Sequence, residues 1–392
     1  MFRIQTINKI AVEGLNLFPR DKYEVASEIL KPDAILVRSA DMHNMGIPVS
    51  VLAIVRAGAG YNNIPVDECS ERGIAVFNTP GANANAVKEL VLAALFLSSR
   101  RISEGIAWIK NLSKDGASVP DIVEGGKAAF EGPEIRGKTL GVVGLGAVGV
   151  MVANDASALG MEVIGFDPYI SVDSAWNLSR TVKHAETIEE LLSRSDYVSI
   201  HVPFSEKTKS MFNAEKIKIM KKGARLINLA RGGLAKEADI AAALDTGQLS
   251  AYITDFPTEE LLSHNKVICI PHLGASTPEA EINCAVMAVK QTMEYLETGM
   301  IRNSVNFPRC KLEQHSAHRL LVANRNIPNM VGQITTLLAG SHINITDLIN
   351  HHQGNYAYNI IDTEQEIPPD ILENINKVPG IVRVRTINRE KL

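Results

Sequence analysis

The chain has 392 residues, of which 45% are hydrophobic, 21% charged and 5% aromatic. This composition is typical of folded proteins and excludes the disordered, collagenous and coiled-coil classes. Forty basic residues against 44 acidic ones give a net charge of −4, and no basic stripe is visible, so a nucleic-acid-binding surface is not expected. The length predicts two or three domains.

Two further classes are excluded by sequence pattern. The four cysteines, Cys69, Cys269, Cys284 and Cys310, lie far apart, so we expect neither a metal site nor a redox dithiol. The first residues lack an apolar segment after a basic start, and no run of about eighteen apolar residues occurs. We therefore expect no signal peptide, no contact with a membrane, and a reducing, cytoplasmic location.

The N-terminal part contains short apolar runs, which predict strands over 34–37 (AILV), 52–55 (LAIV) and 74–77 (IAVF). An Ala/Leu-rich helix over 87–97 is expected to cross into the next domain. A second helix is expected over 278–297. Residues 1–94 together with 279–305 are thus predicted to form a smaller α/β domain, which later motifs mark as substrate-binding.

The middle part, 95–278, alternates apolar runs with helical stretches, a pattern typical of a parallel sheet covered by helices. The expected strands are 139–143, 161–166, 197–202, 225–230, 251–256 and 267–270. This order predicts a doubly wound parallel sheet, the Rossmann architecture of nucleotide-binding domains.

The C-terminal part begins after a segment without periodicity, 306–317, which we expect to be a linker. Residues 318–392 then follow the order βαββαβ, with strands over 319–323, 343–348, 357–361 and 381–384. That order is typical of a ferredoxin-like fold. The whole chain is therefore predicted to be an α/β protein of three domains.

A glycine pattern directly follows the expected strand over 139–143. Gly144, Gly146 and Gly149 permit a tight turn, a close approach to a pyrophosphate, and close packing of helix on strand. Asp167 ends the next strand, where a carboxylate accepts from a ribose hydroxyl and repels a 2′-phosphate. The pattern favours NAD over NADP. The alternative is a structural turn with Asp167 capping a loop.

Three groups suited to 2-hydroxy-acid oxidation follow later strands of the same sheet. Arg231 offers a planar fork for a carboxylate, His272 can take a hydroxyl proton, and Glu260 can hold the imidazole. Each has a simpler interpretation as a surface group. Glu259 competes with Glu260, and His201 also ends a strand.

The segments NTPGANANAVKEL, GKTLGVVGLGAVG, NLARGG and PHLGAST resemble those of the D-isomer-specific 2-hydroxyacid dehydrogenases. The resemblance implies Arg231, Glu260 and His272 as the catalytic trio, and NAD-dependent oxidation of 3-phospho-D-glycerate to 3-phosphohydroxypyruvate. It also implies cofactor contacts from Ala147, Val148, Val202, Leu229, Ala230, Asp255, Gly274 and Ala275. One departure is that Glu260 precedes Leu261 where the family often has proline.

A phosphorylated substrate requires further cations. Arg38 and Arg56 follow strands of the N-terminal domain, and arginine forks suit phosphate. Gly58 and Ala59 resemble the family's carboxylate-binding loop, and Asn83 stands at a position matching a further polar contact. The alternative is that both arginines pair with surface acids.

The C-terminal part resembles an ACT domain, a small amino-acid-sensing module. The resemblance implies L-serine as effector, with Asn326 and Asn344 at the contact positions, and pairing of copies into a homodimer or homotetramer. A dimerisation module without ligand is the alternative. For the whole chain, the alternatives are a hydroxypyruvate or glyoxylate reductase, or a non-catalytic NAD-sensing protein.

Overall fold

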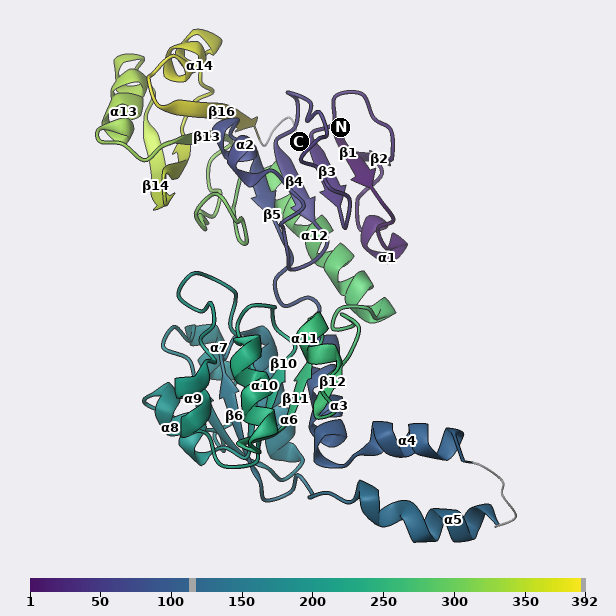
Figure 1. Cartoon of the computed structure of the whole chain (residues 1–392). Helices are drawn as coiled ribbons and strands as arrows, with labels where there is room; N and C mark the ends of the chain where they lie inside the picture. Colours follow the sequence, from purple (N-terminus) through teal and green to yellow (C-terminus); the bar gives the residue numbers. More distant parts are fainter. Residues whose placement is uncertain (113–117, 389–392) are drawn as a thin grey trace. The chain divides into compact units, whose positions relative to one another are not determined.

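The structure, a computed structural model, describes residues 1–112 and 118–388 (Figure 1). The chain divides into two compact units: unit 1 comprises residues 1–83 and 278–392, and unit 2 comprises residues 84–277. The first division falls eleven residues before the expected position at 94/95. The expected C-terminal domain lies within unit 1, together with the expected substrate-binding part.

Unit 2 is built on a 7-stranded parallel sheet of order β12-β11-β10-β9-β6-β7-β8. The predicted doubly wound sheet is confirmed. Its strands are β6 (Thr139–Val143), β7 (Glu162–Phe166), β8 (Lys183–His184), β9 (Tyr197–Ile200), β10 (Ala224–Asn228), β11 (Leu249–Thr254) and β12 (Val267–Cys269). The strand order reverses between β6 and β9, which is where such folds bind ligands.

The helices of unit 2 connect these strands and cover the sheet, because parallel strands need crossovers. They are α3 (Ala84–Ser99), α6 (Ala147–Ala158), α7 (Val172–Asn177), α8 (Ile188–Arg194), α9 (Ala214–Ile219), α10 (Glu237–Asp245) and α11 (Glu259–Leu262). Two further helices, α4 (Ile102–Lys110) and α5 (Val119–Gly126), extend away from the sheet with the short turn η1 (Lys127–Phe130) (Figure 1).

Unit 1 begins with a 5-stranded parallel sheet of order β2-β1-β3-β4-β5. The strands are β1 (Phe2–Ile7), β2 (Tyr23–Ala26), β3 (Ala34–Val37), β4 (Ala53–Arg56) and β5 (Ala75–Phe77), and the helices are α1 (Val12–Leu15), α2 (Val66–Glu71) and α12 (Pro278–Thr298). Sequence reasoning missed β1 and β2. Polar residues interrupt β1 (FRIQTI), and only Ile4 of it is fully buried, so its apolar signal is weak.

The C-terminal part of unit 1 is a 4-stranded antiparallel sheet of order β14-β15-β13-β16. Its elements are β13 (His318–Arg325), α13 (Met330–Gly340), β14 (Ile345–Gln353), β15 (Tyr356–Thr363), α14 (Pro369–Asn376) and β16 (Ile381–Asn388). This order and connectivity are those of the ferredoxin-like fold.

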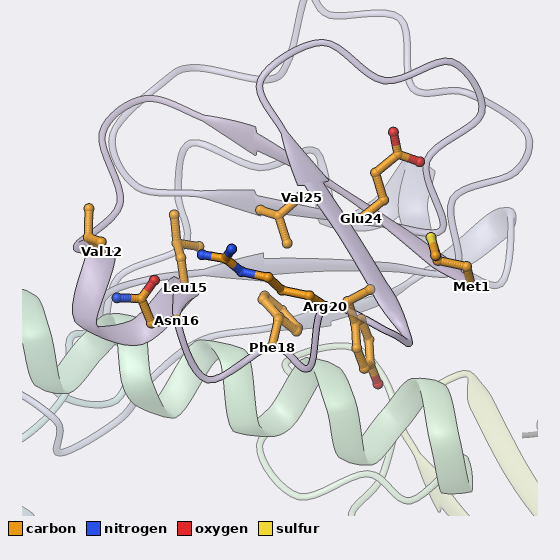
Figure 2. Close-up of a pocket in the computed structure, with 9 residues that line it drawn as sticks. Met1, Val12, Leu15, Asn16, Phe18, Arg20, Glu24 and Val25 are labelled. Atoms are coloured by element: carbon orange, nitrogen blue, oxygen red, sulfur yellow. The ribbon is translucent and has the colours of Figure 1, made fainter.

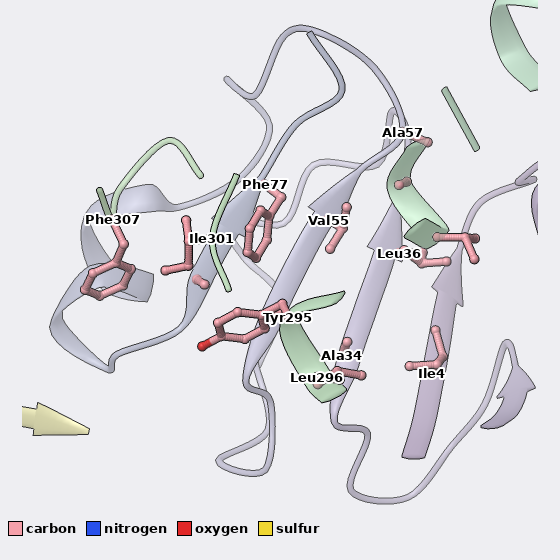
Figure 3. Close-up of a cluster of buried hydrophobic side chains, with 14 of the residues drawn as sticks. Ile4, Ala34, Leu36, Val55, Ala57, Phe77, Tyr295, Leu296, Ile301 and Phe307 are labelled. Atoms are coloured by element: carbon pink, nitrogen blue, oxygen red, sulfur yellow. The ribbon is translucent and has the colours of Figure 1, made fainter. Parts of the chain in front are cut away.

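A cluster of buried hydrophobic side chains joins the two sheets of unit 1 (Figure 3). Side chains of the parallel sheet, such as Leu36 and Phe77, share a buried cluster with Tyr295 of α12 and with Phe307. Phe307 lies in the segment expected to be a linker, which is therefore packed rather than free. The face of the C-terminal sheet that carries Leu321 joins the same cluster, while the alternate residues of β13 face α13, as strand geometry requires.

Two arginines of the C-terminal sheet also form hydrogen bonds with the end of α12. Arg319 is fully buried and bonded through Nε and Nη2 to the Asp362 carboxylate at 2.6 and 2.8 Å. Its remaining donors reach the carbonyls of Thr298 and Leu312. Arg385 donates to the carbonyls of Tyr295 and Leu296 near the end of α12, where a cation also complements the helix dipole.

No helix of the described part of the chain is long and apolar enough to cross a membrane. Within the same residues, no group of three or more histidine, cysteine, aspartate or glutamate side chains could hold a metal ion.

Replacing Asp362 by alanine leaves the buried Arg319 guanidinium without its counter-charge. We expect the free energy of unfolding to fall by about 3–5 kcal/mol. The double change Arg319→Met and Asp362→Leu removes both charges and should cost less. Urea unfolding followed by circular dichroism measures both, with Asp370→Ala, an exposed position of α14, as control. A double variant less stable than Asp362→Ala would contradict this account.

Candidate active site

The glycine loop between β6 and α6 has the shape that a pyrophosphate needs. Gly144 has φ +94, and a Cβ there would lie 2.8 Å from the carbonyl of His201. A Cβ on Gly149 would lie 1.9 Å from the Gly144 oxygen. Gly146, which precedes α6, has open space beside it, so an anion can reach the helix N-terminus and its free N–H groups. Ala147 and Val148 form the first turn.

Asp167 clamps this loop from the end of β7. Its Oδ2 accepts from the N–H of Leu145 at 2.8 Å, and its Oδ1 accepts from the N–H of Tyr169 at 2.9 Å. The loop-capping role, which the sequence left open as the alternative, is thus real. A carboxylate can accept about four hydrogen bonds, so capping leaves acceptor capacity for a ribose hydroxyl.

Asp255, directly after β11, is the most unusual polar group of the sheet edge. It is 2% exposed, and neither carboxylate oxygen has a hydrogen-bond partner in the described part of the chain. Burial raises the pKa of Asp255, while the nearby His272 and Arg231 act in the opposite direction. Two unpaired buried acceptors suit the amide donor of a nicotinamide, so the residues present fit NAD.

Arg231 is placed by the turn that follows β10. The buried Asn228 side chain donates to the carbonyl of Arg231 at 2.9 Å and accepts from the N–H of Ala230 at 3.3 Å, which fixes the turn. The exposed guanidinium donates to the Ala230 carbonyl at 2.7 Å. Sequence reasoning gave Asn228 no role, although it opens the NLARGG segment.

His272 follows β12 and packs against Phe256. The two ring centroids are 4.8 Å apart, edge to face, and Phe256 also lies over Gly232, next to Arg231. This aromatic contact was also missed, because no spacing rule predicts which ring lies beside an imidazole. The only sequence signal for Phe256 is its position directly after Asp255, which is a predicted cofactor residue.

Glu260 is less well placed for its predicted role. It lies in the first turn of α11 and is exposed, and no hydrogen bond links its side chain to His272 among the described residues. The competing histidine, His201, is bonded to the Ser199 hydroxyl at 2.8 Å. Burial lowers the pKa of His201 to about 4, so its imidazole is neutral near pH 7 and is a weaker base than an ordinary histidine.

The remaining predicted cofactor residues follow the strand ends of the same sheet. Val202 lies against Gly144, and Gly274 lies beside Asp255. Leu229 is buried directly after β10, whereas Ala275 is exposed. The parallel strands therefore bring the predicted cofactor residues to one sheet edge.

The predicted substrate residues of unit 1 also gather at strand ends. Arg56 Nε donates to the backbone carbonyl of Arg38 at 3.0 Å, and Arg38 Nη2 donates to Glu281 Oε1 at 2.5 Å. A Cβ on Gly58 would lie 2.1 Å from Arg56 Nη1, so the guanidinium rests on this glycine. The Gly58 N–H is engaged by the carbonyl of Arg56.

Two loop contacts fix the rest of that group. The Gly58 carbonyl accepts from the N–H of Thr79 at 3.0 Å, and the Ala59 carbonyl accepts from the Asn78 amide at 2.6 Å. Asn83 is the last residue of the first segment of unit 1 and is half-buried.

A cavity of about 520 Å³ elsewhere in unit 1 belongs to neither group (Figure 2). It lies beside the edge strand β2 and is lined by residues such as Leu15, Phe18 and Arg20. None of the residues that line it was predicted to bind substrate or cofactor.

In the C-terminal sheet, Asn326 donates through its side chain to the carbonyl of Gly354 at 3.3 Å. Asn329 adopts φ +66 before α13, in the left-handed region where asparagine is enriched among non-glycine residues. Asn344 lies beyond the other end of α13 and is exposed.

Known proteins place the chain in a family. Residues 92–274 match the family model described as "D-isomer specific 2-hydroxyacid dehydrogenase, NAD binding domain". The chain is 33% identical over 387 residues to the D-3-phosphoglycerate dehydrogenase of Methanocaldococcus jannaschii, covering 94% of this chain and 70% of that protein.

The chain belongs to the D-isomer-specific 2-hydroxyacid dehydrogenases. It is also 33% identical to the D-3-phosphoglycerate dehydrogenase of Bacillus subtilis, but spans only 59% of its length. A solved NAD+-bound 3-phosphoglycerate dehydrogenase of Entamoeba histolytica is 27% identical, with TM-score 0.59, and the match covers 78% of this chain and 98% of that one. The prediction of NAD as the cofactor is confirmed.

Asp255→Asn removes a carboxylate whose raised pKa makes the folded protein less stable at high pH. The unfolded carboxyl group loses its proton near its ordinary value of 3.8, below the folded one, so stability is lost as the pH rises between the two values. Asp255→Asn has no such loss and should melt roughly 2–4 °C above the parent at pH 8, with a smaller gain at pH 4.

The same change should weaken NAD binding about tenfold, because one acceptor of the amide is lost. Thermal melting and calorimetric titration with NAD measure the two effects. Asp245→Asn, an exposed position in the same unit, controls for the loss of charge. A lower melting temperature at pH 8 together with unchanged NAD affinity would contradict the assignment.

Proposed function

We propose that the protein oxidises 3-phospho-D-glycerate to 3-phosphohydroxypyruvate with NAD. The observation that carries the proposal is the buried Asp255 carboxylate, which has no hydrogen-bond partner in the described ranges and lies within the electrostatic reach of Arg231 and His272. Its support is that relatives of 33% identity carry the name D-3-phosphoglycerate dehydrogenase. This reaction is a first step toward L-serine.

The chain's own groups have distinct tasks in this reaction. The Arg231 guanidinium pairs with the substrate carboxylate, because its fork matches two oxygens at once. His272 takes the proton of the C2 hydroxyl, and Phe256 restricts the imidazole's orientation. NAD, when bound, supplies the acceptor for the hydride that leaves C2.

Glu260 is proposed as the carboxylate that favours the protonated imidazole. Its support is the family resemblance and its place beyond β11, on the short helix α11. In this role, the Glu260 carboxylate must approach one ring nitrogen of His272, and the other ring nitrogen faces the substrate.

We propose that Arg38 and Arg56 take the substrate phosphate and that Ala59 and Asn83 supply polar contacts. Gly58, which the family resemblance also implied, has its N–H bonded to the Arg56 carbonyl and so has no donor for the substrate. The support is the joining of the two arginines, since Arg56 donates to the backbone of Arg38. Guanidinium forks are the preferred side-chain partners of phosphate oxygens.

We further propose that the C-terminal sheet is an ACT domain that binds L-serine between two copies of the chain. Asn326 and Asn344 flank opposite ends of α13, whose 11 residues span about 16 Å. One serine cannot touch both in a single copy, so their joint use requires a second chain.

A homo-oligomer has a second support in unit 2. Ile102, Ile106 and Ile109 form a stripe on α4 and are 38–51% exposed, and neither α4 nor α5 has a buried residue. A second copy would cover this apolar face. We also propose a cytoplasmic location, because all four cysteines are free.

A reductase of hydroxypyruvate or glyoxylate is the second candidate. The contact of Arg38 with Glu281 favours it, because an arginine already paired with an acid is less available to a phosphate.

Steady-state kinetics with 3-phosphoglycerate and with D-glycerate, each with and without L-serine, test these proposals together. Arg38→Leu and Arg56→Leu should raise the KM for 3-phosphoglycerate at least tenfold, because each removes roughly 1.5–3 kcal/mol of charged hydrogen bonding. The kinetics of glycerate should change little.

L-serine should inhibit the parent, and Asn326→Ala should weaken the inhibition. Equal kinetics with the two substrates, unaffected by either arginine change, would favour the reductase. Unchanged turnover in millimolar serine would overturn the effector proposal alone.

A further inference from the structure

Arg38, the proposed phosphate ligand, is already held by a carboxylate. Its Nη2 lies 2.5 Å from Glu281 Oε1, and the two side chains are 36% and 40% exposed. Glu281 belongs to the first turn of α12, and both residues lie within unit 1. The pair is therefore formed by two residues of the same unit.

Other contacts hold Arg38 at this position. Its backbone carbonyl accepts from Arg56 Nε at 3.0 Å and from the Asn63 amide at 3.4 Å. These bonds fix the backbone, whereas the guanidinium is bonded to Glu281 and stays partly open to solvent. The side chain can change its partner without disturbing the loop.

The charged groups of Arg38, Arg56 and Glu281 all lie near Cys284. Burial raises the pKa of the Cys284 thiol, which lies one turn along α12 from Glu281. A hydrogen bond with Thr79 and the charges of Arg56 and Arg38 lower that pKa, and the charge of Glu281 raises it. The three charged groups thus lie within electrostatic reach of one point. Glu281 reduces their summed formal charge from +2 to +1.

We propose that Glu281 is a specificity-determining residue that competes with the substrate phosphate for Arg38. This rests on the proposed role of Arg38. A phosphate group carries about −1.5 to −2 charge near pH 7 and displaces the single carboxylate from the fork. The displaced carboxylate then repels the phosphate, so Glu281 weakens binding of phosphorylated substrates and leaves unphosphorylated ones unaffected.

Glu281→Gln tests this competition, because glutamine keeps the size of the side chain and removes its charge. The expected result is a three- to tenfold lower dissociation constant for 3-phosphoglycerate in calorimetry at low ionic strength, with a matching fall in KM. The gain should shrink in about 0.5 M salt, because salt screens partly exposed charges. The kinetics of D-glycerate should stay the same.

Glu279→Gln is the matched control. Glu279 lies in the same first turn of α12, is exposed, and makes no ion pair within the described ranges. It carries the same charge relative to the helix dipole, so its removal reports any general effect of charge at this helix end. Unchanged affinity for 3-phosphoglycerate is expected.

Two results would overturn the proposal. Unchanged affinity in Glu281→Gln would mean that the carboxylate does not compete, and weaker affinity would mean that it positions Arg38 for the phosphate. Arg38→Leu tests the phosphate role of Arg38 separately from the role of Glu281. If it leaves 3-phosphoglycerate binding intact, the phosphate role of Arg38 fails. If the parent binds but does not oxidise this compound, the proposed function fails while the calorimetric comparison still decides the role of Glu281.

Discussion

The parallel arrangement of β6 to β12 is the constraint on which the candidate site depends. Strands that run in one direction end at the same sheet edge, so residues that follow them converge although they are far apart in sequence. The glycine loop follows β6, Asp167 follows β7, and Arg231 and Asp255 follow β10 and β11. An antiparallel sheet of the same residues would send half of these groups to the opposite edge.

This edge also explains why polar groups of unusual character occur together. The buried Asp255 carboxylate has no hydrogen-bond partner among the residues that the structure describes, which costs stability. Such a cost is expected where a group must remain available to a ligand. Asn228 donates a hydrogen bond to the backbone of Arg231, and Phe256 packs against the ring of His272. The groups proposed to bind ligands are therefore held by residues that bind none.

In unit 1, α12 contacts the loop that carries Arg38 near its start and the C-terminal sheet near its end. Glu281 in its first turn engages Arg38, and carbonyls near its end accept from Arg385 of the C-terminal sheet. Its 21 residues span about 30 Å. The C-terminal sheet thus shares its core with the part of unit 1 that carries the proposed phosphate ligands.

Much of this could be predicted from sequence, for reasons that differ between elements. The spacing of Gly144, Gly146, Gly149 and Asp167 reflects local backbone demands, so one stretch of sequence reveals it. Strand β1 has polar residues on both faces and gave no clear periodicity.

The pairing of Arg38 with Glu281 joins residues 243 positions apart, and the contact of Phe256 with His272 depends on side-chain packing. No local pattern encodes either contact. The absence of a bond between Glu260 and His272 is of the same kind, because spacing places a residue on an element without fixing its rotamer.

In the proposed reaction, the groups at the edge of the unit 2 sheet bind a phosphorylated 2-hydroxy acid and take its hydroxyl proton, and the hydride of C2 passes to NAD. Single-turnover reaction of the full chain with 3-phosphoglycerate deuterated at C2 measures this directly. We expect the deuterium to be recovered in the reduced nicotinamide, its transfer to be slower than that of hydrogen, and His272→Asn to slow it further. Deuterium retained in the organic product or released to water would contradict the proposed reaction.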